Sequence, residues 1–163
     1  MKKTGIALIL TILFMLIFIT ACGGDKDGTA GYSYVYVSDV LKSLEKSVDS
    51  IIKTEKGTEE TDGNNLLGKA NQYIEFGWFM DERAVPEWDD NPEFNTDNGG
   101  TLEKFANEKD AKARHEYLQT FTGAFAQFSE VHGVWVIRLS NNFSASRQNE
   151  LIKIIKTAIT DLN

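Results

Sequence analysis

The chain of 163 residues contains a single cysteine and only two histidines. One cysteine excludes a disulfide within the chain, and His115 and His132 lack the i, i+4 spacing of a zinc-binding helix. Basic residues are also scarce, because 17 Lys and Arg stand against 24 Asp and Glu and leave a net charge of -7. This acidic balance argues against binding nucleic acid through its phosphates. Only one long apolar run exists, which excludes a multi-pass membrane protein.

The one long apolar run lies at the start of the chain. Lys2 and Lys3 form a basic segment, and the apolar residues 6–19 that follow fall short of a membrane-spanning helix, which needs about 20. The run ends in a sequence that resembles a bacterial lipobox: Ile19, Thr20, Ala21 and Cys22. In that family the cysteine sulfur receives a diacylglyceryl group, and signal peptidase II cleaves before it. The resemblance implies that residues 1–21 are a lipoprotein signal peptide and that Cys22 is the lipidated first residue of the mature protein.

Two other interpretations of this start compete with the lipobox. A plain secretory signal peptide would end at Ala21 and leave Cys22 as a free thiol, and an uncleaved membrane anchor would need a longer apolar run. The lone cysteine favours lipidation, because no second cysteine exists to pair with it in an oxidising compartment. Two acyl chains suffice for stable anchoring.

The residues after the cysteine predict a tether and one domain. Residues 22–33 are polar and rich in glycine, which is typical of a flexible linker. Residues 34–163 are long enough for a single extracytoplasmic α+β domain with its own core. Cleavage removes two lysines and no acid, so the net charge falls from -7 to -9. We expect this acidic domain to lie on the extracytoplasmic face of the cell membrane and to be held there by lipid alone.

Apolar periodicity predicts the elements of the first half of the domain. Spacings of three and four predict a helix over about 38–53 with Ser38 as its N-cap. The charged residues 53–65 indicate a loop. Alternating apolar residues predict a strand over 72–80, and a long surface loop over 81–100 follows it.

The final third predicts a strand over 101–106, a helix over 108–129 capped by Asn107, a strand over 134–139 and a last helix that begins at Ser144. The resulting order, α-β-β-α-β-α, predicts an α+β fold with helices packed on a small sheet of three to four strands. Residues 32–37 are the candidate for the fourth strand. If the last two strands share a sheet, the helix between them predicts a right-handed crossover.

Two segments of the chain carry a family resemblance: residues 100–114, with the sequence GTLEKFANEKDAKAR, and residues 134–140, with the sequence VWVIRLS. They resemble small lipoproteins of low-GC Gram-positive bacteria, some of them carried by prophages. The resemblance covers the C-terminal part of the chain from residue 100 onward. It implies a surface lipoprotein of unknown activity and carries no catalytic residues across.

The loop over 81–100 holds a candidate interaction site. Oxygen-bearing side chains alternate along it, as Ca²⁺ ligands do: Asp89, Asn91, Glu93, Asn95 and Asp97. Phe94 stands where an EF-hand loop requires glycine, so a solvated acidic loop is the favoured interpretation. Its aromatic residues either anchor a partner, as aromatics at interfaces do, or fold back onto the core. The candidate interaction loop comprises Trp88, Asp89, Asp90, Glu93 and Phe94.

No motif predicts catalysis. The sequence lacks a Gly-x-Ser-x-Gly elbow and a phosphate-binding glycine loop, and lipidation of Cys22 would remove the only thiol nucleophile. Arg138 interrupts an apolar strand pattern, and alternation turns its side chain away from Trp135 and Ile137. It therefore either extends to solvent or pairs with an acid such as Glu103 or Glu75.

Three functional hypotheses follow. The favoured one is a non-enzymatic, lipid-anchored binding or interaction domain without cofactor or metal, whose partners are the membrane, through Cys22, and an envelope protein. The second is a prophage accessory lipoprotein that alters phage susceptibility, as in superinfection exclusion. The third is a cation-binding module or weak hydrolase that uses the acidic loop.

Replacing the acyl acceptor tests the anchor. We expect Cys22→Ala to abolish incorporation of labelled fatty acid and to release the protein from the membrane fraction, because lipid supplies its membrane affinity. The measurement is cell fractionation combined with metabolic labelling. A Cys22→Ala protein that still fractionates with membranes and takes up no less label contradicts the lipobox interpretation.

Overall fold

The computed structural model describes residues 34–86, 92–95, 97–122 and 127–163. The expected signal peptide, the lipobox and the tether lie outside this part, as do Trp88, Asp89 and Asp90 of the candidate interaction loop. The elements are α2 (Val37–Ser47), β1 (Ile51–Lys56), β2 (Glu75–Asp81), the 3-10 turn η1 (Glu82–Ala84), β3 (Gly99–Lys104), α3 (Glu108–Leu118), β4 (Phe128–His132), β5 (Trp135–Leu139) and α4 (Ala145–Asp161).

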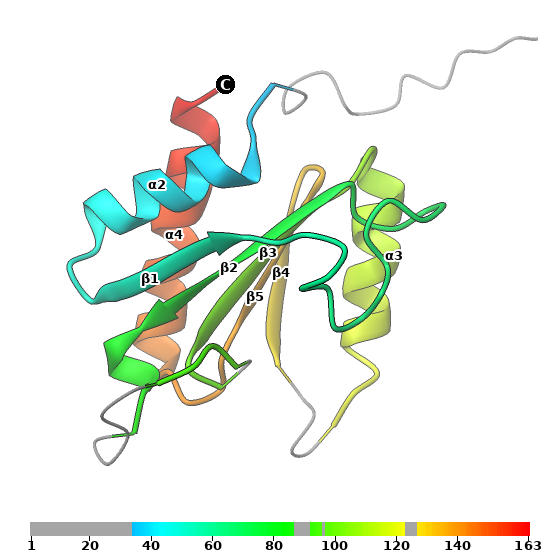
Figure 1. Ribbon diagram of the computed structural model, residues 1–163. Helices are drawn as coiled ribbons and strands as arrows, with labels where there is room; N and C mark the ends of the chain where they lie inside the picture. Colours follow the sequence, from blue (N-terminus) through cyan, green and yellow to red (C-terminus); the bar gives the residue numbers. More distant parts are fainter. Residues whose placement is uncertain (1–33, 87–91, 96, 123–126) are drawn as a thin grey trace, which may run out of the picture.

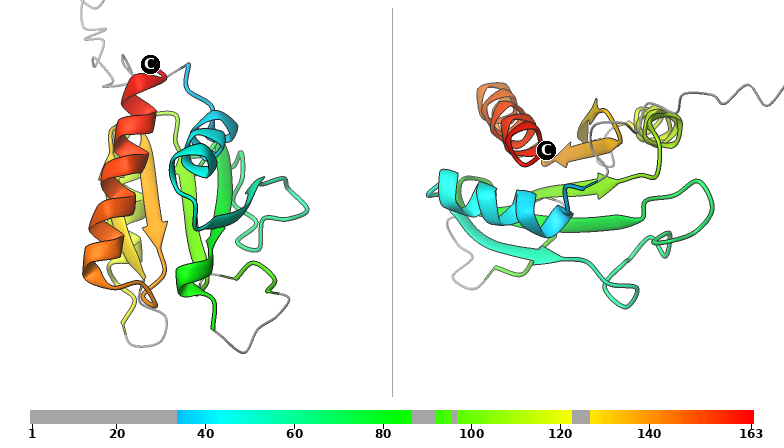
Figure 2. Two further views of the ribbon diagram at one scale, coloured as in Figure 1. Left: turned by 90° about the vertical axis from the view of Figure 1, so that its left-hand side faces the viewer. Right: turned by 90° about the horizontal axis from the view of Figure 1, so that it is seen from above.

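The strands form one five-stranded sheet of order β1-β2-β3-β5-β4, in which every neighbouring pair is antiparallel (Figure 1). Helices α2 and α4 cover one face, and α3 lies on the opposite face (Figure 2). Beside α3, the residues between β1 and β2, which we call the β1–β2 segment (57–74), fold over the same face. The fold is therefore α+β, as the sequence predicts.

The main core lies between the sheet and helices α2 and α4. Helix α2 buries Val37, Val40, Leu41 and Leu44, which share one face of a helix. The sheet contributes the side chains of alternate positions, among them Phe79, Leu102, Trp135, Ile137 and Leu139. A smaller apolar cluster on the other face consists of Tyr73, Phe76, Phe105, Ala111, Leu118 and Val136. Both faces of the central strands are thus covered.

The predicted helix over 38–53 is too long and begins one residue late. Helix α2 starts at Val37, so Ser38 is not its N-cap, and it ends at Ser47. Ile51 continues the three/four spacing in sequence but opens the edge strand β1, whose remaining residues are largely exposed. Residues 34–36 form no strand, so the fourth-strand candidate over 32–37 is wrong in its described part.

The predicted helix over 108–129 is also too long. Helix α3 ends at Leu118, and Phe128 begins the edge strand β4, which the sequence analysis missed. Strands β3 and β5 are antiparallel neighbours, so the connection between them is not a right-handed crossover. The predicted cap Asn107 is confirmed, since its side chain accepts a hydrogen bond from the backbone amide of Asp110 in the first turn of α3. Ser144, predicted to begin the last helix, is the N-cap of α4 and accepts from the backbone amide of Arg147.

A buried ion pair joins the end of β2 to the start of α4. Asp81, predicted to open the acidic surface loop, is fully buried and pairs with Arg147. The Arg147 guanidinium also donates to the hydroxyl of Ser50 at 2.6 Å and to the carboxylate of Glu150 at 2.9 Å.

Within the described ranges no helix is long and apolar enough to span a bilayer.

Removing the buried cation tests its contribution to stability. We expect Arg147→Ala to lower the free energy of unfolding by about 3–5 kcal/mol, because the Asp81 carboxylate would remain buried without its partner. The control Arg83→Ala breaks only an exposed pair with Glu150 and should cost less than about 1 kcal/mol. Equal losses for the two variants in denaturant titrations contradict this assignment.

Candidate ligand-binding cleft

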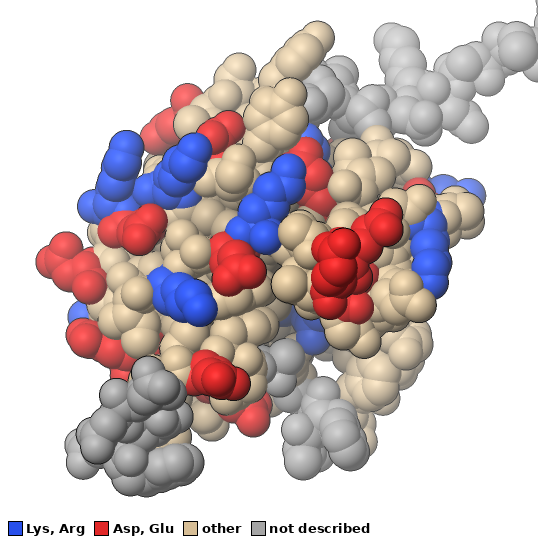
Figure 3. Space-filling view, viewed as in Figure 1, with Lys and Arg blue, Asp and Glu red and all other residues tan. Residues whose placement is uncertain are grey.

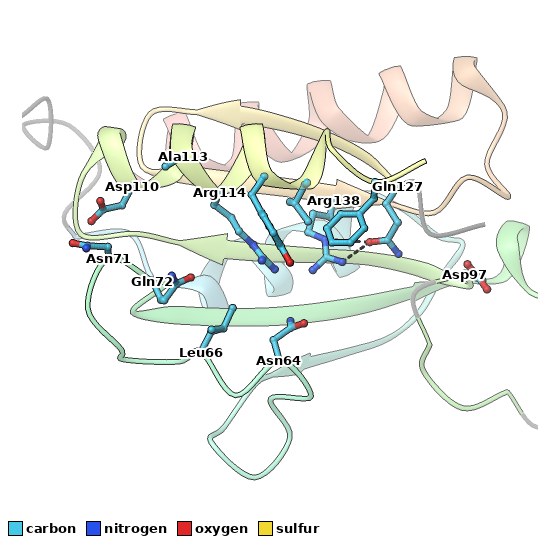
Figure 4. A pocket seen from close by; sticks show the side chains of 13 residues that line it. Asn64, Leu66, Asn71, Gln72, Asp97, Asp110, Ala113, Arg114, Gln127 and Arg138 are labelled. Atoms are coloured by element: carbon cyan, nitrogen blue, oxygen red, sulfur yellow. Dashed lines mark hydrogen bonds between the residues drawn. The ribbon is translucent and has the colours of Figure 1, made fainter. Parts of the chain in front are cut away.

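A cleft of about 900 Å³ lies on the sheet face that carries α3 (Figure 4). Helix α3 and the residues that follow it form one wall, the β1–β2 segment forms the other, and a side chain of β5 reaches the floor. The lining combines side-chain amides, guanidinium groups, carboxylates and apolar groups: Asn64, Leu66, Asn71, Gln72, Asp97, Asp110, Ala113, Arg114, Tyr117, Leu118, Phe121, Gln127 and Arg138.

The floor is organised by one carboxylate held between two guanidinium groups, which we call the Glu103 cluster (Glu103, Arg114 and Arg138). Arg114 Nε donates to Glu103 Oε2 at 2.9 Å and its Nη2 donates to Oε1 at 3.0 Å. Arg138 Nη1 donates to the same Oε1 at 2.9 Å. Such charge-assisted, bidentate pairs are the strongest hydrogen bonds that side chains make.

Local structure brings these three side chains together. Thr101 pairs with Arg138 in the sheet, so Glu103, two residues further along β3, is the diagonal neighbour of Arg138 on the same face. Arg114 shares the buried side of α3 with Ala111 and Leu118, at the three/four spacing of a helix face. The sheet register and the helix periodicity therefore converge on one point.

The Glu103 cluster carries more positive than negative charge. Glu103 is 1% exposed, and it is the single carboxylate that Arg114 and Arg138 contact within hydrogen-bond distance among the described residues. Burial disfavours the charged form of Arg114, but its hydrogen bonds with Glu103 outweigh this and raise its pKa above the ordinary value. Arginine side chains stay protonated in proteins, so two guanidinium groups and one carboxylate give the floor a net charge of about +1.

Gln127 fixes the outer side of Arg138. Arg138 Nε donates to Gln127 Oε1 at 3.1 Å, and Arg138 Nη2 donates to the same oxygen (Figure 4). The partner on this side is a neutral amide, which orients the guanidinium without balancing its charge. The side chain of Arg138 is 14% exposed, so solvent reaches it from the cleft.

Asp62 holds the β1–β2 segment that forms the second wall. Its Oδ2 accepts hydrogen bonds from the backbone amides of Leu66 and Leu67 at 2.7 and 2.8 Å. Its Oδ1 accepts from the Tyr73 hydroxyl at 2.6 Å and from the backbone amide of Asn64 at 3.1 Å. One buried carboxylate thus fixes the turn that presents Asn64 and Leu66 to the cleft.

Aromatic rings lie on the α3 side of the cleft. The rings of Tyr117 and Phe121 meet edge to face with their centroids 5.1 Å apart, and both are substantially exposed. The Arg114 guanidinium lies 5.6 Å from the centre of the Tyr117 ring. In the sequence, the three/four spacing of Phe121, Phe125 and Phe128 predicts that Phe121 lies in an aromatic core face. Instead it is 39% exposed, Phe125 is outside the described residues, and Phe128 belongs to β4.

The described residues of the candidate interaction loop, Glu93 and Phe94, do not line this cleft. Phe94 stacks on Trp78 with centroids 4.2 Å apart and planes 11° apart, as the core-capping alternative expects, while Glu93 is exposed. Lys53 lies 5.1 Å above the same Trp78 ring. The described part of the chain contains no group of three or more His, Cys, Asp or Glu residues placed to hold a metal ion. Partner binding by this loop stays a prediction.

Charges of both signs are interspersed over α2 and β1 on the face shown in Figure 3. Acidic side chains gather over the β1–β2 segment, where Glu59 and Glu60 are exposed (Figure 3). The cationic floor of the cleft therefore lies beside an acidic outer surface, which makes the Glu103 cluster a local exception to the overall charge.

Sequence reasoning found one of the pairs in the Glu103 cluster and missed the rest. Of the two acids offered to Arg138, the structure shows Glu103, while Glu75 pairs with Lys56 and Lys104. The three/four spacing of Arg114 with Ala111 and Leu118 predicts its place on an apolar helix face but indicates no partner for it. The sequence did contain a signal for the pair of Glu103 and Arg114. Both charged residues occupy positions at which the strand and helix periodicities predict buried side chains.

The pH dependence of stability tests the Asp62 hub. Burial opposes ionisation of Asp62, but the Tyr73 hydroxyl and the backbone amides together lower its pKa below the ordinary 3.8. A lowered pKa in the folded state stabilises the fold above the unfolded pKa, and this contribution is lost as the pH falls through the folded value. We expect the difference in unfolding free energy between wild type and Asp62→Asn to be constant near neutral pH and to shrink below about pH 4. Denaturant titrations from pH 7 to pH 2.5 check this, and a difference that grows in acid contradicts it.

Comparisons of the chain with protein families, with curated proteins and with solved structures found no match. The function therefore has to follow from the residues of the chain itself.

Proposed function

We propose that this protein is a lipid-anchored, extracytoplasmic, non-enzymatic binding domain whose ligand occupies the cleft between α3 and the β1–β2 segment. The observation that carries the proposal is the cleft itself, whose volume of about 900 Å³ lies in the range of small-molecule sites. Apolar and aromatic side chains line its α3 side, side-chain amides line most of the opposite wall, and oriented polar groups converge on its floor. A ligand site needs such a combination of apolar surface and convergent polar groups.

The polar groups of the cleft are held rigidly in place. Arg114 and Arg138 are fixed by Glu103 and by Gln127, and the opposite wall is fixed by Asp62. Groups that are already ordered lose little entropy when a ligand binds, so rigid lining groups favour affinity. Guanidinium groups, amides and aromatic rings serve recognition, which supports binding rather than catalysis as the role of the site.

The proposal of membrane anchoring is supported by the order of basic start, apolar run, small residues and Cys22 in the sequence. The first described residues lead directly into α2, so the folded domain begins at once after the expected tether. A domain held in this way samples small molecules at the outer surface of the membrane.

Filling the cleft tests the proposed site. Ala113 lines the cleft from an exposed position of α3, so Ala113→Trp should occupy its mouth without disturbing the core. Lys112→Trp places the same bulk on the same helix at an exposed residue that does not line the cleft. The measurement is thermal unfolding of the mature protein against a panel of small molecules.

We expect compounds that stabilise wild type and Lys112→Trp but not Ala113→Trp. A compound at ten times its Kd stabilises by about 1.4 kcal/mol, which raises the Tm of a domain of this size by about 5 °C. Stabilising compounds that act equally on both tryptophan variants place the ligand elsewhere and contradict the proposal.

A further inference from the structure

Among the residues that the structure describes, the charge on the floor of the cleft is not balanced by its neighbours. Two guanidinium groups share the one carboxylate of Glu103, and Nε and Nη2 of Arg138 donate to the neutral amide of Gln127. One N–H group on each of Nη1 and Nη2 of Arg138 then remains for a ligand. The two carboxylates of the lining, Asp97 and Asp110, lie at opposite ends of the cleft (Figure 4). Asp110 is further engaged by the Asn107 side chain, which donates to it at 3.0 Å. The centre of the cleft therefore holds an excess cation.

The surroundings of this cation are apolar on the α3 side. Leu118 and Phe121, which follow Arg114 by four and seven residues, line the cleft together with Leu66 of the β1–β2 segment. An anion that bound Arg138 would place the rest of its structure against these side chains. A low-dielectric surrounding strengthens the attraction between the cation and such an anion.

We propose that the cleft binds a small organic carboxylate with an apolar or aromatic body. The carboxylate lies against Arg138, and the body packs against Leu118 and Phe121. This inference rests on the proposed function and names the class of ligand for the same site.

A carboxylate fits the floor better than a phosphate monoester. The planar fork of a guanidinium matches a planar carboxylate. One excess positive charge balances a monoanion, whereas a phosphate dianion would leave a negative excess in a cleft that already has Asp97 and Asp110 at its ends. The charge and the geometry of the floor agree on the same class.

Gln127 orients Arg138 without neutralising it, so the positive charge of Arg138 stays available to an anionic ligand. A glutamate at this position would place a carboxylate on Arg138 with the same shape and would neutralise the cluster. Gln127→Glu therefore imitates the bound ligand, and an added ion pair preserves the fold. Gln119→Glu is the matched control, because it adds the same charge at the C-cap of α3, at an exposed residue outside the lining.

The experiment titrates the mature protein with 4-phenylbutyrate, with its neutral amide 4-phenylbutanamide and with phenyl phosphate, and calorimetry measures each Kd. We expect 4-phenylbutyrate to bind at least about tenfold more tightly than the amide, since a hydrogen bond to a charged group is worth at least that factor. Gln127→Glu should weaken 4-phenylbutyrate by at least about tenfold as well. Gln119→Glu should change it by less than about twofold, because the added charge is exposed and screened.

Equal binding of the acid and the amide overturns the inference, and so does a Gln127→Glu protein that binds the acid as wild type does. Tighter binding of phenyl phosphate overturns the assignment to carboxylates. If no probe binds wild type while other compounds still distinguish the Ala113→Trp protein from wild type, the ligand class is wrong and the proposed site stands. If no compound distinguishes the Ala113→Trp protein from wild type, the proposed function itself is wrong, and the inference about the ligand class fails with it.

Discussion

The carboxylate of Glu103 is the constraint on which this site depends. It is buried, and a buried charge is tolerated only where partners satisfy it. Arg114 comes from α3 and Arg138 from β5, so one residue of β3 ties a helix and a neighbouring strand to the centre of the sheet. Because both guanidinium groups use this one anchor, their positions are fixed before any ligand arrives. The same sharing leaves one positive charge that no carboxylate of the described residues balances in the cleft.

One face of the sheet carries the main apolar core, and the opposite face carries the cleft. The face under α2 and α4 is covered by a continuous apolar layer, and the buried pair of Asp81 and Arg147 closes its end. The opposite face has a smaller apolar cluster and gives up part of its area to charged and amide groups. A sheet that is stabilised from one side can carry a polar cleft on the other, because the loss of apolar burial there is offset by the larger core.

Periodic apolar patterns explain which parts of this fold the sequence predicts. Strands β2 and β5 lie inside the sheet and helix α4 packs on it, so their apolar residues recur with clear strand and helix periodicity. Their positions therefore follow from the sequence. The two edge strands are half exposed and mixed in polarity, and Ile51 happened to continue a helical spacing, so β1 and β4 were missed. The pair of Glu103 and Arg138 was predictable because a charged residue in an apolar strand tends to pair with an opposite charge on a neighbouring strand. The cleft was not, because it requires α3 and the β1–β2 segment, which lie far apart in the chain, to face each other.

The central claim is that Glu103 balances only one of the two guanidinium groups. Its most direct test is the affinity of 4-phenylbutyrate for Glu103→Gln protein whose folded state has been verified by its NMR spectrum. The account predicts tighter binding than to wild type, because neutralising Glu103 raises the charge of the floor from about +1 to about +2. The increase should diminish as salt is added. Weaker or unchanged binding to the folded variant contradicts the account.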